Sequence, residues 1–190
     1  MTYLSNIRHS KLIWNYANLI FMNTAYILTG GNLGDRLSSL LMAKEYIGRE
    51  TGNIVSSSSI YETEAWGNNS QPDFYNQVHI TTTGLSAEQM MKKILEIEGQ
   101  MGRVRAAKNA PRIIDIDILF FNADIINKKD LIIPHAEISN RRFVLTPLNE
   151  LSPWLVHPVL NKTISELLST CKDKLSVKPI RTLLPYQQIL

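Results

Sequence analysis

Six segments with the hydrophobic spacing of strands and helices follow one another in the order strand, helix, strand, strand, helix, strand. Apolar residues at every second position indicate a strand with one covered face, and apolar residues three or four apart indicate a helix. The polar segment at 64–73 contains Gly67 and Pro72 and is longer than most connections. The predicted elements are a strand at 25–29 that ends at Gly30-Gly31-Asn32, a helix at 35–49, strands at 54–63 and 75–83, a helix at 86–102 and a strand at 112–121.

This order is typical of a ferredoxin-like sandwich, an α+β fold in which helices pack on one face of a single antiparallel sheet. A chain of 190 residues with 44% hydrophobic residues can bury the core of one such domain. Ser86 and Gln89 form a capping box that predicts the start of the second helix. After the last strand we expect a short hairpin around Asn127, with strands at 125–126 and 131–133, and helices at 142–151 and 163–170.

The two ends of the chain differ from its middle in charge. Residues 1–21 carry two cations without an acid, and residues 171–190 carry four cations against Asp173. The net charge of +3 therefore belongs to the ends, because residues 22–170 carry a net charge of −2. We expect an N-terminal extension at 1–22, a single domain at 23–171 and a basic tail at 172–190.

The N-terminal extension contains an apolar patch at 12–22 that Asn15 and Asn18 interrupt, so neither a secretory signal nor a membrane span is expected. Met22 directly precedes a strong strand, and we hypothesise that translation begins there in nature. The single cysteine, Cys171, cannot form an internal disulfide and fits a reducing compartment. We therefore expect a cytoplasmic protein with no membrane partner.

The strand at 112–121 carries two carboxylates on one face. Asp115 and Asp117 are two positions apart, so they point to the same side of a strand. The residues expected on the opposite face are Ile114, Ile116, Ile118 and Phe120. Two ordinary acids on a solvated strand face are the alternative, but unpaired like charges on a mostly buried strand are costly without a metal or cations. Mg²⁺ suits this pair, because it takes one or two carboxylates and completes its shell with water and substrate phosphates.

Cations flank this strand on both sides. Upstream, four of them fall within ten residues without an acid: Arg103, Arg105, Lys108 and Arg112. Downstream lie His135 and the pair Arg141 and Arg142. Guanidinium groups beside a divalent cation suit polyphosphate transfer, and a solvated basic loop is the alternative. The glycine-rich segment at 30–35 lacks the spacing and the lysine of a P-loop, which favours a tight turn and a helix start.

Taken together, these segments resemble the 6-hydroxymethyl-7,8-dihydropterin pyrophosphokinase family of folate synthesis. The resemblance covers residues 25–157 and rests on several motifs in a fixed order. The motifs are Gly30-Gly31-Asn32-Leu33-Gly34-Asp35, Gln71-Pro72-Asp73-Phe74-Tyr75-Asn76, Gly102-Arg103-Val104-Arg105, Pro111-Arg112 with Asp115-Ile116-Asp117, and Pro134-His135 with Asn140-Arg141-Arg142-Phe143.

The resemblance implies transfer of the β,γ-diphosphate of ATP to the pterin hydroxymethyl group, with release of AMP and with two Mg²⁺ ions held by Asp115 and Asp117. It implies that Arg103 and Arg112 are catalytic together with these aspartates. The residues implied for ATP are Glu98 near the ribose, the backbone of Ile118 at adenine, and Arg103, Arg105, Arg112, His135 and Arg141. For the pterin, the resemblance implies stacking between Phe74 and Phe143, with Asn76 and the backbone near Thr63 and Trp66 at the edge of the ring.

The segments at 62–73 and 103–112 correspond to loops that close over the substrates in this family. The chain departs from the family pattern in three places. The link at 106–110 is short and has no tryptophan, Ala136 stands where an aromatic hydroxyl occurs, and Phe74 stands where tyrosine is common.

Two other function classes fit parts of the pattern. An RNA-binding module presents aromatic residues interleaved with cations on its strands, whereas this strand presents Asp115 and Asp117, which repel phosphate without a metal. A different Mg²⁺-dependent nucleotidyl or phosphoryl transferase is the second alternative. We therefore expect small-molecule substrates, no nucleic-acid partner and a monomer.

Overall fold

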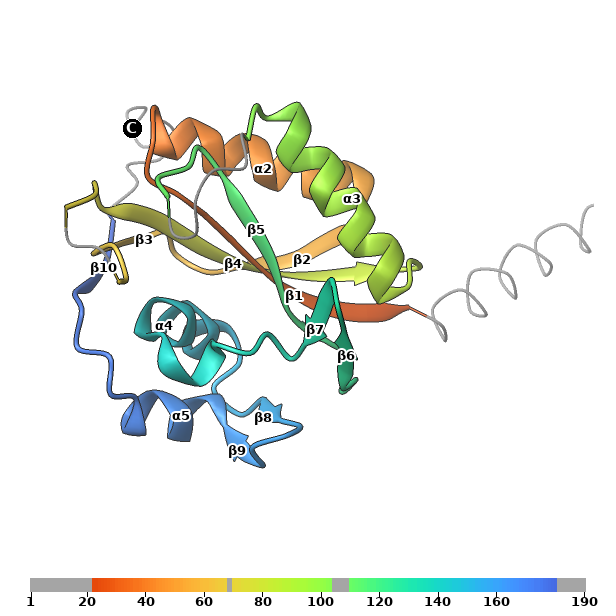
Figure 1. The fold of residues 1–190 in the computed structure, drawn as a ribbon. Coiled ribbons are helices and arrows are strands. Elements are labelled where there is room, and N and C mark those ends of the chain that lie inside the picture. Colours follow the sequence, from red (N-terminus) through yellow and green to blue (C-terminus); the bar gives the residue numbers. More distant parts are fainter. Residues whose placement is uncertain (1–21, 68–69, 104–109, 181–190) are drawn as a thin grey trace, which may run out of the picture.

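The computed structural model describes residues 22–67, 70–103 and 110–180, whose arrangement is shown in Figure 1. The predicted order of strands and helices is confirmed, with further elements after it. The strands are β1 (Asn23–Gly31), β2 (Asn53–Ser57), β3 (Tyr61–Thr63), β4 (Phe74–Thr83), β5 (Asp115–Phe121), β6 (Ile126–Lys128), β7 (Leu131–Ile133), β8 (Val156–His157), β9 (Lys162–Thr163) and β10 (Val177–Pro179). The helices are α2 (Arg36–Glu50), α3 (Ala87–Gln100), the 3-10 helix η1 (Ile138–Asn140), α4 (Arg142–Leu151) and α5 (Ile164–Thr170).

The main sheet is antiparallel, in the order β10-β3-β4-β1-β5, with β2 also paired to β4. The capping box of Ser86 and Gln89 is confirmed at the start of α3. Asp35 caps α2 and accepts a hydrogen bond from the Ser38 amide. Asn127, which we expected at the turn of the hairpin, lies instead within β6 opposite Ile132.

Helices cover both faces of the sheet, so the prediction of helices on one face is wrong (Figure 1). Ile27 and Leu28 are neighbours on β1 and point to opposite faces, yet both are buried. Ile27 packs in the core beneath α2 and α3, whereas Leu28 packs against α4 and α5. The second face needs cover because the central strands are apolar on both sides, and Leu145 and Leu148 of α4 supply it.

The single strand predicted at 54–63 is two strands, β2 and β3, which both pair with β4. The break lies at residues 58–60. There the amide and hydroxyl of Ser59 donate hydrogen bonds to the Glu150 carboxylate of α4, at 2.9 and 3.0 Å. Gln77 of β4 donates its side-chain amide to the Ser58 carbonyl oxygen at 2.7 Å. At the break, side chains of Glu150 and Gln77 therefore provide hydrogen-bond partners for backbone groups of Ser58 and Ser59.

The strand predicted at 112–121 is β5, which differs from the prediction in its first residue and in the face to which Phe120 points. β5 begins at Asp115 because Arg112 lies across the end of β1, where its backbone exchanges hydrogen bonds with Asn32. Ile118 pairs with Ile27 and Phe120 with Tyr26, so Leu119 is an extra residue in the ladder. This bulge turns Phe120 to the α4 face, and the prediction that it shares a face with Ile118 is wrong.

Residues assigned by sequence to a C-terminal tail contribute to the sheet. Val177, Lys178 and Pro179 form β10, which pairs with β3 at the edge of the sheet. Residues 1–21, which carry the predicted N-terminal extension apart from Met22, lie outside the described residues. Within the part of the chain that the structure describes, no helix has the length and apolar character needed to cross a membrane.

Candidate active site

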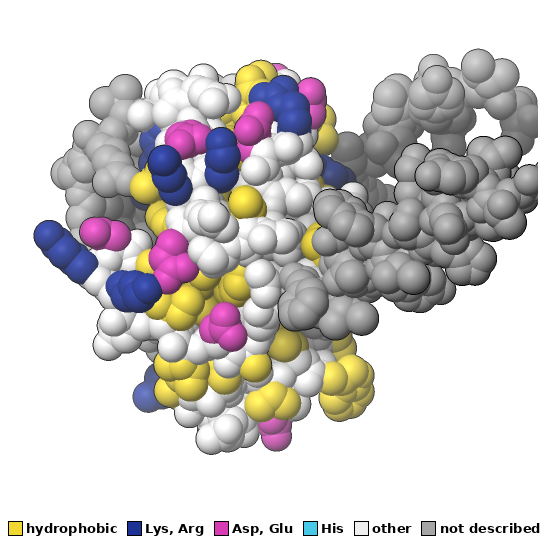
Figure 2. All heavy atoms as spheres, turned by 90° about the vertical axis from the view of Figure 1, so that its right-hand side faces the viewer, with side chains coloured by type: hydrophobic (Ala, Val, Ile, Leu, Met, Phe, Trp, Pro, Cys, Tyr) yellow, Lys and Arg dark blue, Asp and Glu magenta, His cyan; other side chains and the backbone are white. Residues whose placement is uncertain are grey.

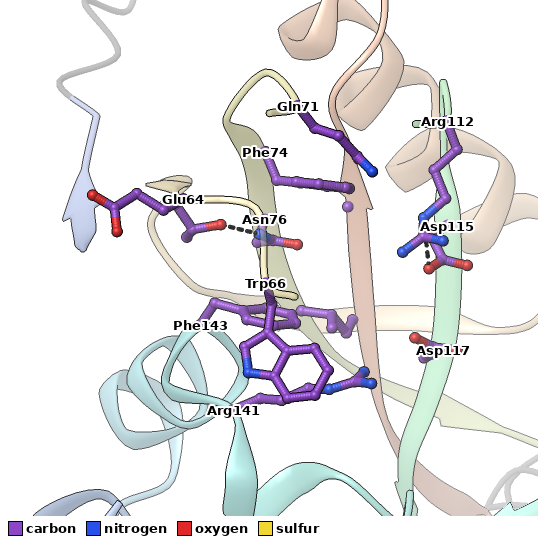
Figure 3. A pocket seen from close by; sticks show the side chains of 13 residues that line it. Glu64, Trp66, Gln71, Phe74, Asn76, Arg112, Asp115, Asp117, Arg141 and Phe143 are labelled. Carbon is purple, nitrogen blue, oxygen red and sulfur yellow. Dashed lines mark hydrogen bonds and ion pairs between the residues drawn. The ribbon is translucent and has the colours of Figure 1, made fainter. Parts of the chain in front are cut away.

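A pocket opens where β1, β4 and β5 meet the start of α4 and the segment after β3 (Figure 3). In Figure 3, Asp115 and Asp117 project from β5 on one side of it, and aromatic side chains form the other side. The side chains that line the pocket are Leu28, Thr63, Glu64, Trp66, Gln71, Phe74, Asn76, Arg112, Asp115, Asp117, Arg141 and Phe143, together with Gly30. The topology thus brings five distant chain segments to one cavity.

Four side chains of alternating charge form a chain at the end of β5. Glu98 on α3 is 4% exposed, pairs with Arg103 and accepts a hydrogen bond from the Ile116 amide at 2.8 Å. Arg103 Nη1 also lies 2.7 Å from Asp115 Oδ1, and Arg112 Nε lies 3.0 Å from Asp115 Oδ2. The Asp115 carboxylate is therefore ion-paired with two guanidinium groups, one shortly after α3 and one shortly before β5.

Asp117 has a different electrostatic environment from Asp115. Burial raises the pKa of the Asp117 carboxyl above its ordinary value, and the neighbouring negative charge of Asp115 raises it further. His135, Arg141 and Arg112 act in the opposite direction and lower this pKa. Burial likewise raises the pKa of Glu98, against the charge of Arg103. The site concentrates carboxylates that are costly to ionise unless positive charge is close.

The opposite side of the pocket holds a buried amide between aromatic rings. Asn76 of β4 is 3% exposed and donates its side-chain amide to Thr63 Oγ1 at 2.8 Å. Its Oδ1 lies over Gly30, where a Cβ atom would come within 2.3 Å of it. Phe74 and Phe143 line the same space from opposite directions (Figure 3). A flat ring with polar edges fits such a site, because the aromatic side chains can pack on its faces and the amide can hydrogen-bond to its edge.

Trp66 and Arg141 lie against each other at the mouth of the pocket (Figure 3). The Arg141 guanidinium lies 4.9 Å from the Trp66 ring centre and 5.8 Å from that of Phe143. Its Nε is buried and has no hydrogen-bond partner among the described residues. This guanidinium therefore keeps hydrogen-bonding capacity that an anion in the pocket can use.

The structure gathers most of the predicted site residues. Nine of them line the pocket: Thr63, Trp66, Phe74, Asn76, Arg112, Asp115, Asp117, Arg141 and Phe143. Glu98 and Arg103 adjoin it through Asp115, and His135 acts on the Asp117 charge. Ile118 packs in the core, and its backbone lies in β5, the last strand of the sheet. Arg105 lies outside the described residues.

Asn32 has a role that sequence reasoning missed when it assigned this segment to a turn. It is 3% exposed and donates its side-chain amide to Gln71 Oε1 and the Pro72 carbonyl oxygen at 3.2 and 3.1 Å. Its Oδ1 accepts a hydrogen bond from the Arg112 amide at 2.9 Å. Asn32 therefore ties the segment before β4 to the segment before β5. In the sequence, only its place directly after two glycines at a strand end distinguishes this asparagine.

Arg36, at the start of α2, is a second positioning residue that the sequence did not reveal. Its Nη1 donates to the Asp73 carbonyl oxygen at 2.7 Å and lies 3.0 Å from the Glu62 carboxylate. Its guanidinium lies 3.9 Å from the centre of the Tyr75 ring. Both ends of the segment between β3 and β4 are held by this one side chain.

A family model and relatives of known sequence match most of this chain. The family model described as 7,8-dihydro-6-hydroxymethylpterin-pyrophosphokinase matches residues 26–153. The chain is 37% identical over 169 residues to 2-amino-4-hydroxy-6-hydroxymethyldihydropteridine pyrophosphokinase of Aquifex aeolicus, covering 89% of this chain and 99% of that protein. It is also 37% identical over 163 residues to the folic acid synthesis protein fol1 of Pneumocystis carinii, covering 86% of this chain but 22% of that protein.

Among solved structures, the chain is similar to the wild-type HPPK-DHPS of Plasmodium falciparum with pteroate, with a TM-score of 0.63 and 20% sequence identity. This likeness covers 78% of the chain and 44% of the Plasmodium chain. At this level of identity the match supports the fold. The chain thus spans nearly all of one relative and a minor part of others.

Proposed function

The chain belongs to the 7,8-dihydro-6-hydroxymethylpterin-pyrophosphokinase family, and we propose that it transfers the β,γ-diphosphate of ATP to the hydroxymethyl group of 6-hydroxymethyl-7,8-dihydropterin, with release of AMP, in folate synthesis. One observation carries the proposal: a single pocket holds an amide between aromatic rings on one side and two carboxylates with guanidinium groups on the other. The first half suits a flat heterocycle and the second a magnesium-bound polyphosphate.

The pterin ring lies between Phe74 and Phe143 in this proposal. Asn76 recognises its polar edge, because Thr63 already fixes one end of the Asn76 amide and leaves Oδ1 as an acceptor. The indole of Trp66 covers the ring from the solvent side. Aromatic faces take up the apolar surface of the ring, and the buried amide supplies specificity.

Two Mg²⁺ ions are held by Asp115 and Asp117 in this proposal. The residues fit: both carboxylates line the pocket, and the raised pKa of Asp117 marks a negative charge that lacks sufficient compensation. Among the described residues no cluster of three or more His, Cys, Asp or Glu side chains could hold a metal alone. A site with two carboxylates leaves coordination positions on Mg²⁺ for phosphate oxygens. When bound, the metal ions neutralise charge on the transferred diphosphate.

Arg103 and Arg112 have two uses in this proposal. Each is ion-paired with Asp115, and these bonds hold the carboxylate in position before substrates bind. Phosphate oxygens compete for the same guanidinium groups, so both arginines would also bind the diphosphate, and Asp115 would then hold the metal. Arg105, outside the described residues, and Arg141, with its unpaired Nε, complete the set of phosphate contacts.

The nucleoside end of ATP lies along β5 and α3. The Ile116 amide points away from β1 toward Glu98, so the backbone of Ile118, two residues on, presents its groups to the same edge. This supports adenine recognition by Ile118 and a place for the ribose near Glu98. His135 lies close enough to influence the charge of Asp117, which supports a phosphate contact for it.

The chemical step needs no nucleophile from the protein. The hydroxymethyl oxygen of the pterin attacks the β-phosphorus of ATP and loses its proton to water, the bond from this phosphorus to the oxygen of the α-phosphate breaks, and AMP leaves. The arginines stabilise the negative charge that spreads over the phosphate oxygens, and the aromatic pocket orients the attacking hydroxyl. Catalysis therefore rests on position and charge.

The wider assignments form part of the same proposal. We assign a ferredoxin-like core to β1, α2, β3, β4, α3 and β5, because their sheet order β3-β4-β1-β5 fits that fold. We further propose a cytoplasmic monomer with a single domain at 23–171, to which β10 adds an edge strand. We also propose that nucleic acid is no partner; on the face in Figure 2, Lys and Arg side chains are interspersed with Asp and Glu.

The test is to incubate the full chain with ATP, Mg²⁺ and 6-hydroxymethyl-7,8-dihydropterin and to identify the nucleotide product. We expect AMP, formed only when the pterin is present. ADP as the product would indicate a different phosphoryl transferase, and AMP formed without pterin would indicate a nucleotidyl transferase or hydrolase. Either result would overturn the proposal.

A further inference from the structure

The segment from Asp173 to Ile180 contacts two walls of the pocket, apart from the β5 side, without lining the pocket itself. Figure 1 shows it leaving α5, passing α4 and reaching the edge of the sheet at β10. One pocket wall is the start of α4, which carries Arg141 and Phe143. The other wall is the end of β3 and the residues after it, which carry Trp66. We call residues 173–180 the C-terminal strap.

At the first wall, the strap caps a helix that has no cap of its own. The N-cap position of α4 is Arg141, whose side chain makes no capping hydrogen bond, and the first turn contains no acid. Asp173 Oδ2 accepts a hydrogen bond from the Arg142 amide at 2.9 Å, and its Oδ1 accepts one from the Leu175 amide at 3.0 Å. A carboxylate at this end also complements the helix dipole. Asp173 therefore fixes the backbone at Arg142, which lies between the pocket residues Arg141 and Phe143.

At the second wall, the strap continues the sheet up to the pocket. Val177 pairs with Thr63, the residue whose hydroxyl accepts the Asn76 amide. The Ser176 amide donates to Glu64 Oε2 at 3.2 Å, and the Glu64 amide donates to the Ser176 carbonyl oxygen at 3.3 Å. These bonds end two residues before Trp66. The strap thus fixes the end of β3 and Glu64, close before Trp66 in the chain.

Trp66 and Arg141 meet across the pocket mouth, with the guanidinium 4.9 Å from the ring centre. Each belongs to a wall that the strap holds, so their contact depends on both attachments. From this geometry we infer that Asp173 is a positioning residue: it sets Arg141 and Phe143 against Trp66, and the strap fixes the width of the pterin site. The part of this inference that names the pterin rests on the proposed function.

The experiment uses a full-length protein in which Trp66 is the sole tryptophan. Trp14→Phe and Trp154→Phe remove the other two; Trp14 lies outside the described residues, and Trp154 is 81% exposed. Into this parent we introduce Asp173→Ala, Asp173→Asn and the control Asp130→Ala, which alters an exposed acid in the β6–β7 turn. Acrylamide quenching of Trp66 then reports the contact with Arg141 without any substrate.

We expect Asp173→Ala to raise the quenching constant of Trp66 by about twofold, because the cation–π contact that shields the indole is loosened. In calorimetric titrations with a non-hydrolysable ATP analogue and Mg²⁺ present, we expect it to weaken pterin binding by about tenfold, which corresponds to 1.4 kcal/mol. Asp173→Asn should stay within about twofold of the parent, since asparagine caps helices as well as aspartate does. Asp130→Ala should change neither quantity.

Unchanged quenching and unchanged pterin affinity in folded Asp173→Ala would overturn the inference, even if its thermal midpoint fell, because Asp173 would then be a structural cap only. If the alanine variant does not fold, Asp173→Ser is measured instead, because its short hydroxyl cannot accept hydrogen bonds from both the Arg142 and the Leu175 amide as the carboxylate does. Unchanged values in that variant would overturn the inference equally. A parent that bound no pterin would refute the proposed function, while the quenching comparison would still decide the role of Asp173.

Discussion

At the scale of single residues, Asp117 shows a conflict between stability and the proposed activity. Burial and the charge of Asp115 raise the pKa of its carboxyl in the folded chain above the ordinary value of 3.8. The folded state then binds a proton more readily than the unfolded state, so ionising Asp117 at neutral pH lowers the free energy of unfolding. A residue kept for packing alone would gain nothing from this charge, which favours a role in metal binding.

Asp117→Asn is therefore expected to separate activity from stability. Turnover should fall by at least about 100-fold, because the amide is a poor ligand for Mg²⁺ in place of a carboxylate. The free energy of unfolding at neutral pH should stay the same or rise, because the substitution removes a buried charge. Steady-state production of AMP and urea unfolding followed by circular dichroism measure the two quantities.

The matched control is Asp124→Asn, at an exposed aspartate after β5. It should leave both activity and stability unchanged. Near-full activity of Asp117→Asn would contradict the metal assignment, and a clear loss of stability would contradict the electrostatic account of its raised pKa.

At the scale of elements, the pairing of β1 with β4 determines how the pterin site is built. Their register places Gly30 opposite Asn76, at the end of both strands that opens into the pocket. A Cβ atom on Gly30 would lie 2.3 Å from Asn76 Oδ1. The glycine is needed for close approach between two strands, and its φ is not among the positive values.

Gly30→Ala should displace the Asn76 side chain and weaken pterin binding by about tenfold, since the hydrogen-bonding edge of the site shifts. Binding of a non-hydrolysable ATP analogue should change by less than about twofold, because the atoms nearest to the added Cβ belong to Asn76 and Tyr75 of β4 and not to β5 or α3. Calorimetric titration with each ligand measures both. The control is Gly99→Ala, at an exposed position of α3 where an added Cβ has no neighbouring atom within 4 Å. Equal weakening for both ligands would point to general disruption of the sheet.

At the scale of the whole molecule, the sequence was sufficient where local pattern decides the structure. The order of strands and helices, the capping box at Ser86 and the shared side of Asp115 and Asp117 all follow from spacing along the chain. The bulge at Leu119 and the break between β2 and β3 do not, because contacts with distant residues such as Glu150 decide them. Cover on both sheet faces likewise depends on tertiary packing.

The site divides in the same way. The residues proposed to touch substrate carry recognisable chemistry, so their types and order in the sequence point to them. Asn32, Arg36 and Asp173 act through hydrogen bonds to backbone groups far along the chain, and such partners cannot be inferred from spacing. Their roles become visible only when the fold brings loop, helix and strap together.

A buried histidine gives the whole fold a pH dependence that can be measured. His79 of β4 is fully buried beneath α2, within hydrogen-bond distance of Ser57 Oγ at 2.9 Å and Thr29 Oγ1 at 3.3 Å. Burial, with a smaller contribution from Lys44, lowers its pKa from 6.5 to about 3. Folded His79 is therefore neutral at every pH at which the protein is expected to work.

Between pH 6.5 and about 3 the unfolded chain binds a proton at His79 that the folded chain does not, so acid should destabilise the fold. The stability associated with neutral His79 is fully present above pH 6.5. As the pH falls from 6.5 to about 3, the free energy of unfolding decreases by about 1.4 kcal/mol per pH unit. Urea unfolding of the wild type and of His79→Gln at a series of pH values measures it. Asp117 and Glu98, whose pKa values are raised, act in the opposite direction in both proteins, so the difference between the two slopes isolates His79. Equal slopes would show that His79 is protonated in the folded state, and the account of its buried neutral ring would be wrong.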